Sequence, residues 1–187
     1  MGVTRGWWRA RAGSRTDRGV NVFVPERGVG ADVDAVVTGG VGRVRVTGTD
    51  VVLVTAPDPG VEVVATGHAT VVIGSSATCR VRLRGHATLL DRDDPECGVP
   101  VRVDVVAAGD CVARLTRPGY RVTARGRAHV VVSPTGDAGG GRMAQVAACR
   151  VGGRARVTCH PTGHTTVTRA GRGVDVQVRT APRVFPP

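Results

Sequence analysis

Residues 81–89 read VRLRGHATL, and residues 122–130 read VTARGRAHV. In both stretches apolar or small residues alternate with polar ones on either side of a central glycine. Such alternation places every second side chain on the same face of a β-strand. A third copy surrounds Gly153, and the frame shared by the three is V-x-A-x-G-x-A-x-V. This frame predicts a strand on each side of every glycine.

Looser copies of the frame extend the pattern to seven units. Their centres are Gly48, Gly67, Gly85, Gly109, Gly126, Gly153 and Gly171. Successive centres are 19, 18, 24, 17, 27 and 18 residues apart, so four of the six gaps lie near 18. The two longer gaps contain turn-rich insertions, DRDDPECGVP at 91–100 and SPTGDAGGGRM at 133–143, each after the second strand of its unit. Stacked repeats tolerate insertions at one corner in this way.

Two architectures accommodate alternating strands at this spacing. In a β-solenoid each unit forms one coil, whereas in an antiparallel β-sandwich or barrel each glycine lies at the tip of a hairpin. In the clearest units the flanking apolar residues are four apart, as Leu83 and Ala87 are, so they keep one face through the glycine. A two-residue hairpin would separate facing residues by an odd number, although a three-residue loop would not. The units at Gly48 and Gly171 depart from this parity.

We therefore expect an all-β, single-domain β-solenoid of about seven imperfect coils of roughly 18 residues. The antiparallel sandwich or barrel is the alternative.

Short motifs recur at the corners of these units. They read GHAT at 67–70 and 85–88, GRAH at 126–129, GRAR at 153–156 and GHTT at 163–166. On these motifs, roughly residues 40–180 resemble bacterial β-helical repeat proteins with G-x-A-x-V units. The resemblance implies a stacked scaffold and no particular activity, so it assigns no functional residue.

The composition also favours strands. The chain has 38 valines against five leucines, and β-branched side chains suit strands better than helices. All 26 basic residues are arginine, a bias that a GC-rich genome also produces. The net charge is +4 over residues 1–27, −2 over 28–120 and +9 over 121–187. The basic C-terminal third suggests a polyanionic partner, and improved solubility is the alternative explanation.

The pattern divides the chain into three parts. Residues 1–30 are rich in arginine and glycine without periodicity and are expected to form a flexible basic arm. The β-repeat domain is expected over 31–182, with a C-terminal tail over 183–187. No stretch has the apolar length of a classical signal peptide or a membrane span, so cytoplasmic localisation is favoured. The five cysteines are irregularly spaced, and most are expected to be buried in the core.

Arginines alternate with apolar residues along the predicted strands, for example at Arg43 and Arg45. Alternation points them away from the core, and stacked coils would gather them into a face that suits phosphate, sulfate or carboxylate. The candidate anion-binding residues are Arg80, Arg82, Arg84, Arg125, Arg127, Arg154 and Arg156. The alternative is that they form only the polar side of an amphipathic sheet.

A zinc site is suggested by Cys159, His160 and His164, which lie within six residues. No C-x-x-C motif is present, and Cys149 is the nearest candidate for a fourth ligand. Cys149 and Cys159 share the inward parity, so burial in the core is the alternative for both.

Two further clusters are candidates for ion binding. If the coils stack, His68 and His86 lie on adjacent coils and could bind a metal or an anion. An acidic insertion offers oxygen ligands for Ca²⁺, namely Asp91, Asp93, Asp94 and Glu96. Exposed turn residues and a solvated acidic loop are the respective alternatives.

Catalytic motifs are absent from the sequence. It contains no nucleophile elbow, no phosphate-binding glycine loop and no paired His and Glu at helical spacing, and it indicates no cofactor. The first hypothesis is a non-enzymatic structural or binding module that self-associates or binds a polyanion such as nucleic acid or an acidic glycan. The second is a polysaccharide-acting β-helix enzyme, with Asp104, Asp110 and His129 as acid–base candidates.

Overall fold

A computed structural model describes residues 14–17, 19–25, 33–57, 59–74, 76–92, 101–117, 119–133, 145–159, 164–169 and 175–178. These residues form seventeen strands and no helix, which confirms the prediction of an all-β chain. Within these ranges, no helix has the length and apolarity needed to cross a membrane.

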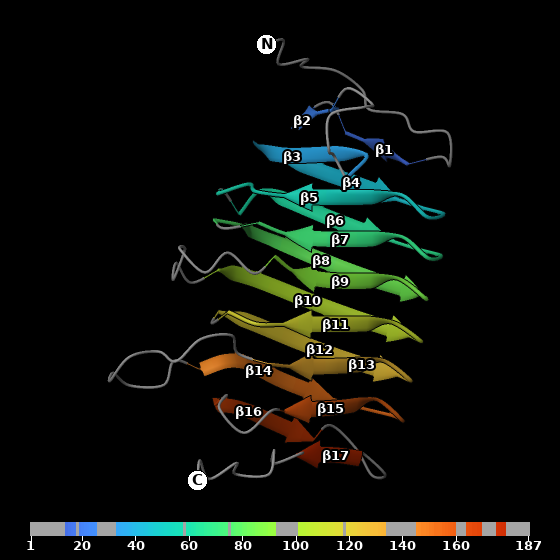
Figure 1. The fold of residues 1–187 in the computed structure, drawn as a ribbon, viewed down its shortest axis with the longest axis vertical. Helices are drawn as coiled ribbons and strands as arrows, with labels where there is room; N and C mark the ends of the chain where they lie inside the picture. Colours follow the sequence, from blue (N-terminus) through green and yellow to red (C-terminus); the bar gives the residue numbers. More distant parts are fainter. Residues whose placement is uncertain are drawn as a thin grey trace, which may run out of the picture.

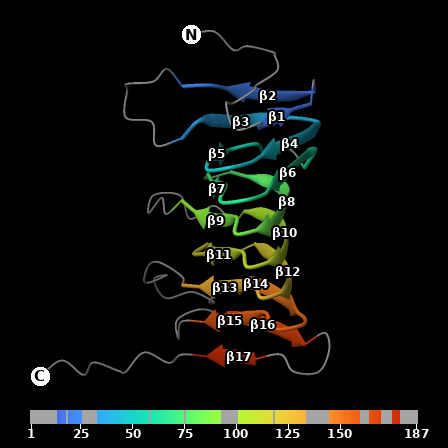
Figure 2. The ribbon, with the colours of Figure 1, turned by 90° about the vertical axis from the view of Figure 1, so that its right-hand side faces the viewer.

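The strands form two mixed sheets, neither of which is closed. Sheet A has the order β1 (Arg15–Thr16), β4 (Gly42–Val46), β6 (Val61–Ala65), β8 (Thr78–Gly85), β10 (Arg102–Gly109), β12 (Tyr120–Gly126), β14 (Gln145–Val151) and β16 (His164–Arg169). Sheet B has the order β17 (Asp175–Val178), β15 (Arg156–Cys159), β13 (His129–Val132), β11 (Val112–Leu115), β9 (Thr88–Asp91), β7 (Thr70–Ile73), β5 (Val51–Val54), β3 (Ala35–Gly40) and β2 (Val20–Phe23). From β3 onward the chain alternates between the two sheets, which form two layers of one column (Figures 1 and 2).

Neighbouring strands are parallel from β4 to β16 in sheet A and from β3 to β17 in sheet B. Each strand pairs with the next strand of its own sheet, as β8 does with β10, where Val81 lies opposite Val105. Consecutive strands such as β8 and β9 lie in different sheets. Gly85 between them is therefore a corner and not the tip of a hairpin.

Six of the seven predicted glycine centres lie in the described residues, and all six have positive φ. The angles run from 68° to 101° for Gly48, Gly67, Gly85, Gly109, Gly126 and Gly153. Each glycine after the first would place an added Cβ only 3.0–3.4 Å from the backbone of the preceding one. The glycines therefore form a column along one corner, where a side chain would meet both a left-handed backbone and a close neighbour. Gly171 lies outside the described residues.

The core lies between the two sheets and is filled mainly by valine. Leu83 and Ala87 are both fully buried on either side of Gly85, so the predicted parity is confirmed there. The prediction that the Gly48 unit departs from this parity is wrong, because Val46 and Val52 are buried. Asp50 precedes β5 at the corner position that Ala69 holds before β7, the neighbouring strand of sheet B.

The N-terminal end of the column is closed by antiparallel strands. β1 pairs with β4, and β2 pairs with β3. Ser14 is fully buried and donates a hydrogen bond to the Asp50 carboxylate, while Asp17 and Asp34 accept hydrogen bonds from backbone N–H groups. Residues 14–17 and 19–25 thus belong to the folded body, contrary to the prediction of a flexible arm. Residues 1–13 lie outside the described residues.

The predicted insertions fall where expected in the chain. β9 ends at Asp91 and β13 ends at Val132, and both strands belong to sheet B. Most residues of the two insertions, 93–100 and 134–143, lie outside the described residues, as does the predicted tail at 183–187.

Candidate anion-binding face

The outer face of sheet A and the corner that follows it carry most of the described charge. We call the outward positions from β4 to β14, together with this corner, the arginine face; β1, which carries the exposed Arg15, lies outside it. They hold eleven arginines, namely Arg43, Arg45, Arg80, Arg82, Arg84, Arg102, Arg121, Arg125, Arg127, Arg150 and Arg154. Three acidic side chains, Glu62, Asp104 and Asp110, share the face, so eleven minus three leaves a net charge of +8.

The arginines concentrate on every second strand, β4, β8 and β12. Because neighbouring strands lie about 4.8 Å apart, these strands are separated by about 9.6 Å. One register row reads Arg43, Glu62, Arg80, Asp104 and Arg121 across five neighbouring strands. Opposite charges therefore alternate along the row, which avoids the repulsion of like charges placed directly side by side.

Two of the acidic residues are held in ion pairs. Glu62 lies between Arg43 and Arg82, with closest N–O distances of 2.6 Å to each. Asp110 binds Arg127 through two bonds, 2.6 Å from Nε to Oδ1 and 2.7 Å from Nη2 to Oδ2. The hydrogen bond from Arg127 lowers the pKa of Asp110.

The other eight arginines of the face have no carboxylate within 4 Å among the described residues. They are Arg45, Arg80, Arg84, Arg102, Arg121, Arg125, Arg150 and Arg154. Their guanidinium groups are available to an external anion, to which each can donate two parallel hydrogen bonds.

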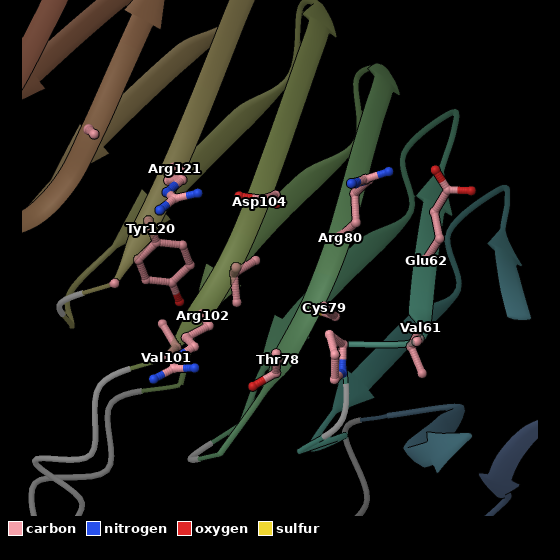
Figure 3. Close-up of a pocket in the computed structure, with 15 residues that line it drawn as sticks. Val61, Glu62, Thr78, Cys79, Arg80, Val101, Arg102, Asp104, Tyr120 and Arg121 are labelled. Atoms are coloured by element: carbon pink, nitrogen blue, oxygen red, sulfur yellow. The ribbon is translucent and has the colours of Figure 1, made fainter. Parts of the chain in front are cut away.

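A hollow of about 790 Å³ lies at the beginning of β6, β8, β10 and β12 (Figure 3). Gly60 and Gly119 line it, and an added Cβ at either would collide with the carbonyl oxygen of Gly40 or Val101, so these glycines let neighbouring backbone segments approach closely. Arg80, Arg102 and Arg121 line the same hollow. Glu62 and Asp104 line it as well, so three guanidinium groups without ion-pair partners and two carboxylates meet at one place on the arginine face, with a net charge of +1.

Comparisons with family models, curated proteins and solved structures find no match for this chain.

The buried lining of the hollow does not offer a nucleophile at neutral pH. Burial, followed by the nearby Asp104 carboxylate, raises the pKa of the Cys79 thiol to about 12. Burial likewise raises the pKa of the Tyr120 phenol. Both groups remain protonated, so the arrangement favours binding by charge and hydrogen bonds.

The seven predicted arginines divide among three places. Strands β8 and β12 carry four of them on the outer face of sheet A, namely Arg80, Arg82, Arg84 and Arg125. Arg127 and Arg154 follow the corner glycines at the edge of this face. Arg156 lies on the outer face of sheet B, so the expectation that all seven share one face is wrong for Arg156. The reason is that a corner glycine sends the residues after it into the other sheet.

Sequence analysis noted Arg43 and Arg45 without including them in the candidate set, and it did not identify three other arginines of the face. Arg102, Arg121 and Arg150 are exposed on β10, β12 and β14. Each has a buried residue on both sides in the sequence, as in VRV around Arg102. The same alternation that identified the other arginines was therefore available for these three.

His68 and His86 stack, as predicted for adjacent coils. Their ring centroids are 5.0 Å apart and the rings are nearly parallel, at 7°. Both follow a corner glycine, and the next residues along this corner are Asp110, Arg127 and Arg154. No group of three metal-ligating side chains occurs anywhere in the described ranges.

The described residues do not include all three of the proposed zinc ligands. Cys159 is buried in the core, His164 begins β16, and His160 lies outside the described residues. Cys149 is also buried, which raises the pKa of its thiol to about 12.

The acidic insertion differs from the expected solvated loop at its first residue. Asp91 has no exposed side-chain surface and forms an ion pair with Arg117, whose side chain is 7% exposed. Asp93, Asp94 and Glu96 lie outside the described residues.

The three acid–base candidates are not brought together. Asp104 lies on the outer face of sheet A, Asp110 at the glycine corner and His129 on the outer face of sheet B. His129 instead lies 2.9 Å from the Thr158 hydroxyl, on a neighbouring strand.

Proposed function

We propose that this chain is a β-solenoid scaffold whose arginine face binds a polyanion. The observation that carries the proposal is the net charge of +8 on this one face, on which eight arginines have no carboxylate within 4 Å among the described residues.

The pairing of the strands supports the solenoid. In an antiparallel sandwich or barrel built from hairpins, consecutive strands would pair with each other in the same sheet. Here consecutive strands from β3 onward lie in different sheets, and each pairs in parallel with the strand one circuit later. The column of corner glycines agrees with this winding, because equivalent residues of successive circuits lie on top of one another.

The spacing of the arginines supports a long ligand over a single small anion. Arg43, Arg80 and Arg121 recur along one register row at about 9.6 Å, and Arg84 and Arg125 repeat this interval near the corner. An extended chain of anionic groups lying across the strands could contact several of them at once. The gain in affinity would then come from charge neutralisation and release of counterions.

The chemistry of the face favours recognition of charge over recognition of bases. No phenylalanine, tyrosine or tryptophan occurs at the described outward positions of sheet A, and the aromatic rings at its corner are the two stacked imidazoles of His68 and His86. Single-stranded nucleic acids usually bind to surfaces on which bases stack against aromatic rings. The proposed ligand is therefore an acidic glycan or the phosphate backbone of a nucleic acid.

The test measures affinity for heparin and for duplex DNA as a function of salt. We expect the logarithm of the association constant to fall linearly with the logarithm of salt concentration. Replacing Arg80 and Arg121 by glutamine should reduce the magnitude of the slope for duplex DNA by about 1.8, because each lost phosphate contact removes about 0.9. The matched control replaces Arg114 and Arg156, which lie on sheet B and change the net charge equally.

Two results would contradict the proposal. One is affinity for both ligands that does not depend on salt. The other is an equal loss of affinity in the sheet A variant and in the sheet B control, since the effect would then come from overall charge and not from the arginine face.

A further inference from the structure

The outer face of sheet B differs from that of sheet A in carrying an uncharged apolar row. Along one register row, five neighbouring strands place apolar side chains outward. From β2 to β9 these are Phe23, Val36, Leu53, Val72 and Leu90. We call this row the apolar ridge.

Two charged residues lie at the edges of the ridge, Asp34 two residues before Val36 and Arg92 two residues after Leu90, and both are exposed. Val51, Thr70 and Thr88 form the adjacent outward row on β5, β7 and β9. The first charged outward side chain reached along the ridge is Arg114, on β11. Outward positions of a solvent-facing sheet are normally polar, so an apolar row that continues over five strands requires an explanation.

Phe23 is the most prominent side chain of the ridge. It is one of two phenylalanines in the chain and is 43% exposed. Exposed aromatic side chains are enriched at protein interfaces, where they contribute a large share of the binding energy. Leu53, at the middle of the ridge, is 9% exposed because its neighbours flank it on both sides.

We infer that the apolar ridge is the contact surface between two copies of this chain. The charge distribution selects this partner. Each copy carries a net charge of +11, so two arginine faces repel each other. The ridge row itself carries no charge, and the charged residues at its edges are one acid, Asp34, and one base, Arg92. An anionic membrane or a polyanion would be attracted to the arginine face on the other side of the molecule.

A two-fold axis through Leu53 makes the ridge self-complementary. Phe23 of one copy then lies against Leu90 of the other, and Val36 against Val72, in an isologous contact. Arg114 of each copy falls beyond Phe23 of the partner. The two arginine faces point away from each other, separated by four sheet layers of about 10 Å spacing, which exceeds the Debye length of about 8 Å at physiological salt.

The size of the ridge sets the expected strength of the dimer. Five strands about 4.8 Å apart and about 13 Å long cover an area on the order of 300 Å² per copy. Stable dimers bury about 800 Å² per partner. The association is therefore weak and becomes visible only at high protein concentration.

The experiment is sedimentation velocity of the full chain from about 10 μM to 1 mM, at low and high salt. The inference rests on the scaffold part of the proposed function and is independent of polyanion binding. The two are distinguishable because salt acts in opposite directions. Salt screens the repulsion between two positive copies and strengthens the dimer, whereas it weakens binding to a polyanion.

A pair of matched variants locates the contact. Val72→Arg places a charge on the ridge, and Val106→Arg makes the same change at a 37% exposed position on the outer face of sheet A. We expect Val72→Arg to weaken dimerisation at least tenfold and Val106→Arg to change it less than threefold. Phe23→Ser, at an exposed position that is tolerant of substitution, provides a second ridge variant, with an expected loss of at least threefold.

Leu53→Cys tests the two-fold axis directly. This variant should form an intermolecular disulfide under mild oxidation, and the unmodified chain should not form one at the same rate. A chain that stays monomeric at 1 mM in high salt would overturn the inference. Equal effects of Val72→Arg and Val106→Arg would overturn it too, as would binding of the ridge to lipid vesicles by a chain that remains monomeric.

Discussion

The ion pair between Asp91 and Arg117 should be one of the most sensitive points of the fold. The Asp91 side chain has no exposed surface, and its Oδ2 accepts hydrogen bonds from the Thr116 backbone and hydroxyl at 3.2 and 2.9 Å. Nη2 of Arg117 donates to the carbonyl oxygens of Ile73 and Gly74 at 3.1 and 3.0 Å. The cluster thereby connects the ends of β7, β9 and β11 at the corner opposite the glycines.

The expected cost follows from leaving one charge buried alone. Arg117→Met leaves the Asp91 carboxylate without its cation and removes the donor to two carbonyl groups, so we expect a loss of about 3–5 kcal/mol in the free energy of unfolding. This is a large part of the roughly 5–15 kcal/mol of a typical domain. Asp91→Asn should cost a similar amount. The double variant buries no unpaired charge and should cost at least about 2 kcal/mol less than the sum of the two.

The measurement is urea unfolding followed by far-ultraviolet circular dichroism. The matched control is Arg127→Met, which removes an arginine from the exposed pair with Asp110 and should change the free energy of unfolding far less than Arg117→Met. A cost below about 1 kcal/mol for Arg117→Met, or full additivity in the double variant, would refute the argument from burial.

Three further predictions concern the glycine column, the thiols and pH. Gly126→Ala should destabilise the chain by more than the roughly 1–2 kcal/mol of a left-handed backbone, because its Cβ would lie 3.0 Å from a backbone nitrogen. Gly67→Ala, with 3.4 Å at the equivalent contact, should cost less in the same urea assay, and the reverse order would contradict the model of the column. In a Cys97→Ser variant the native thiols should react slowly with Ellman's reagent at pH 8 and completely in denaturant, since burial raises the pKa of Cys149 to about 12. Fast labelling of the native variant is the contrary result. Burial, followed by two neighbouring arginines, lowers the pKa of His129 in the fold below its ordinary value of 6.5. The unfolded chain therefore takes up the proton more readily, so stability should decrease as pH falls through about 6.5, and His129→Gln should show a smaller decrease in melting temperature.

The local winding of the chain was predictable because it depends on short-range patterns. The four-residue separation of Leu83 and Ala87 already indicated that the chain bends at Gly85 without changing face. The parity also holds at Gly48, but the sequence pattern did not reveal it there because Asp50 occupies the position of a small apolar residue. The hydrogen bond that accommodates Asp50 comes from Ser14, which is 36 residues away. No local sequence pattern indicates a hydrogen-bond partner at that distance.

The layout of charge depends on register between strands, which the sequence pattern did not determine. Alternation identified Arg84 and Arg156 as outward residues, but only the path of the chain assigns them to different sheets. Asp91 similarly belongs to an acidic stretch that resembles a solvated loop. Its burial depends on Arg117, and the two residues meet because β9 and β11 pair side by side.

The placement of arginines on every second strand of sheet A limits how the chain can change in length. Deleting the single circuit from Gly48 to Thr66 would bring β4 beside β8, and Arg43 and Arg45 would then face Arg80 and Arg82 directly. Removing the next circuit as well would restore opposite charges between neighbours, with Arg43 beside Asp104. Circuits can therefore be lost or gained in pairs at a much smaller electrostatic cost than singly. A molecular ruler engineered from this protein would be lengthened in steps of two.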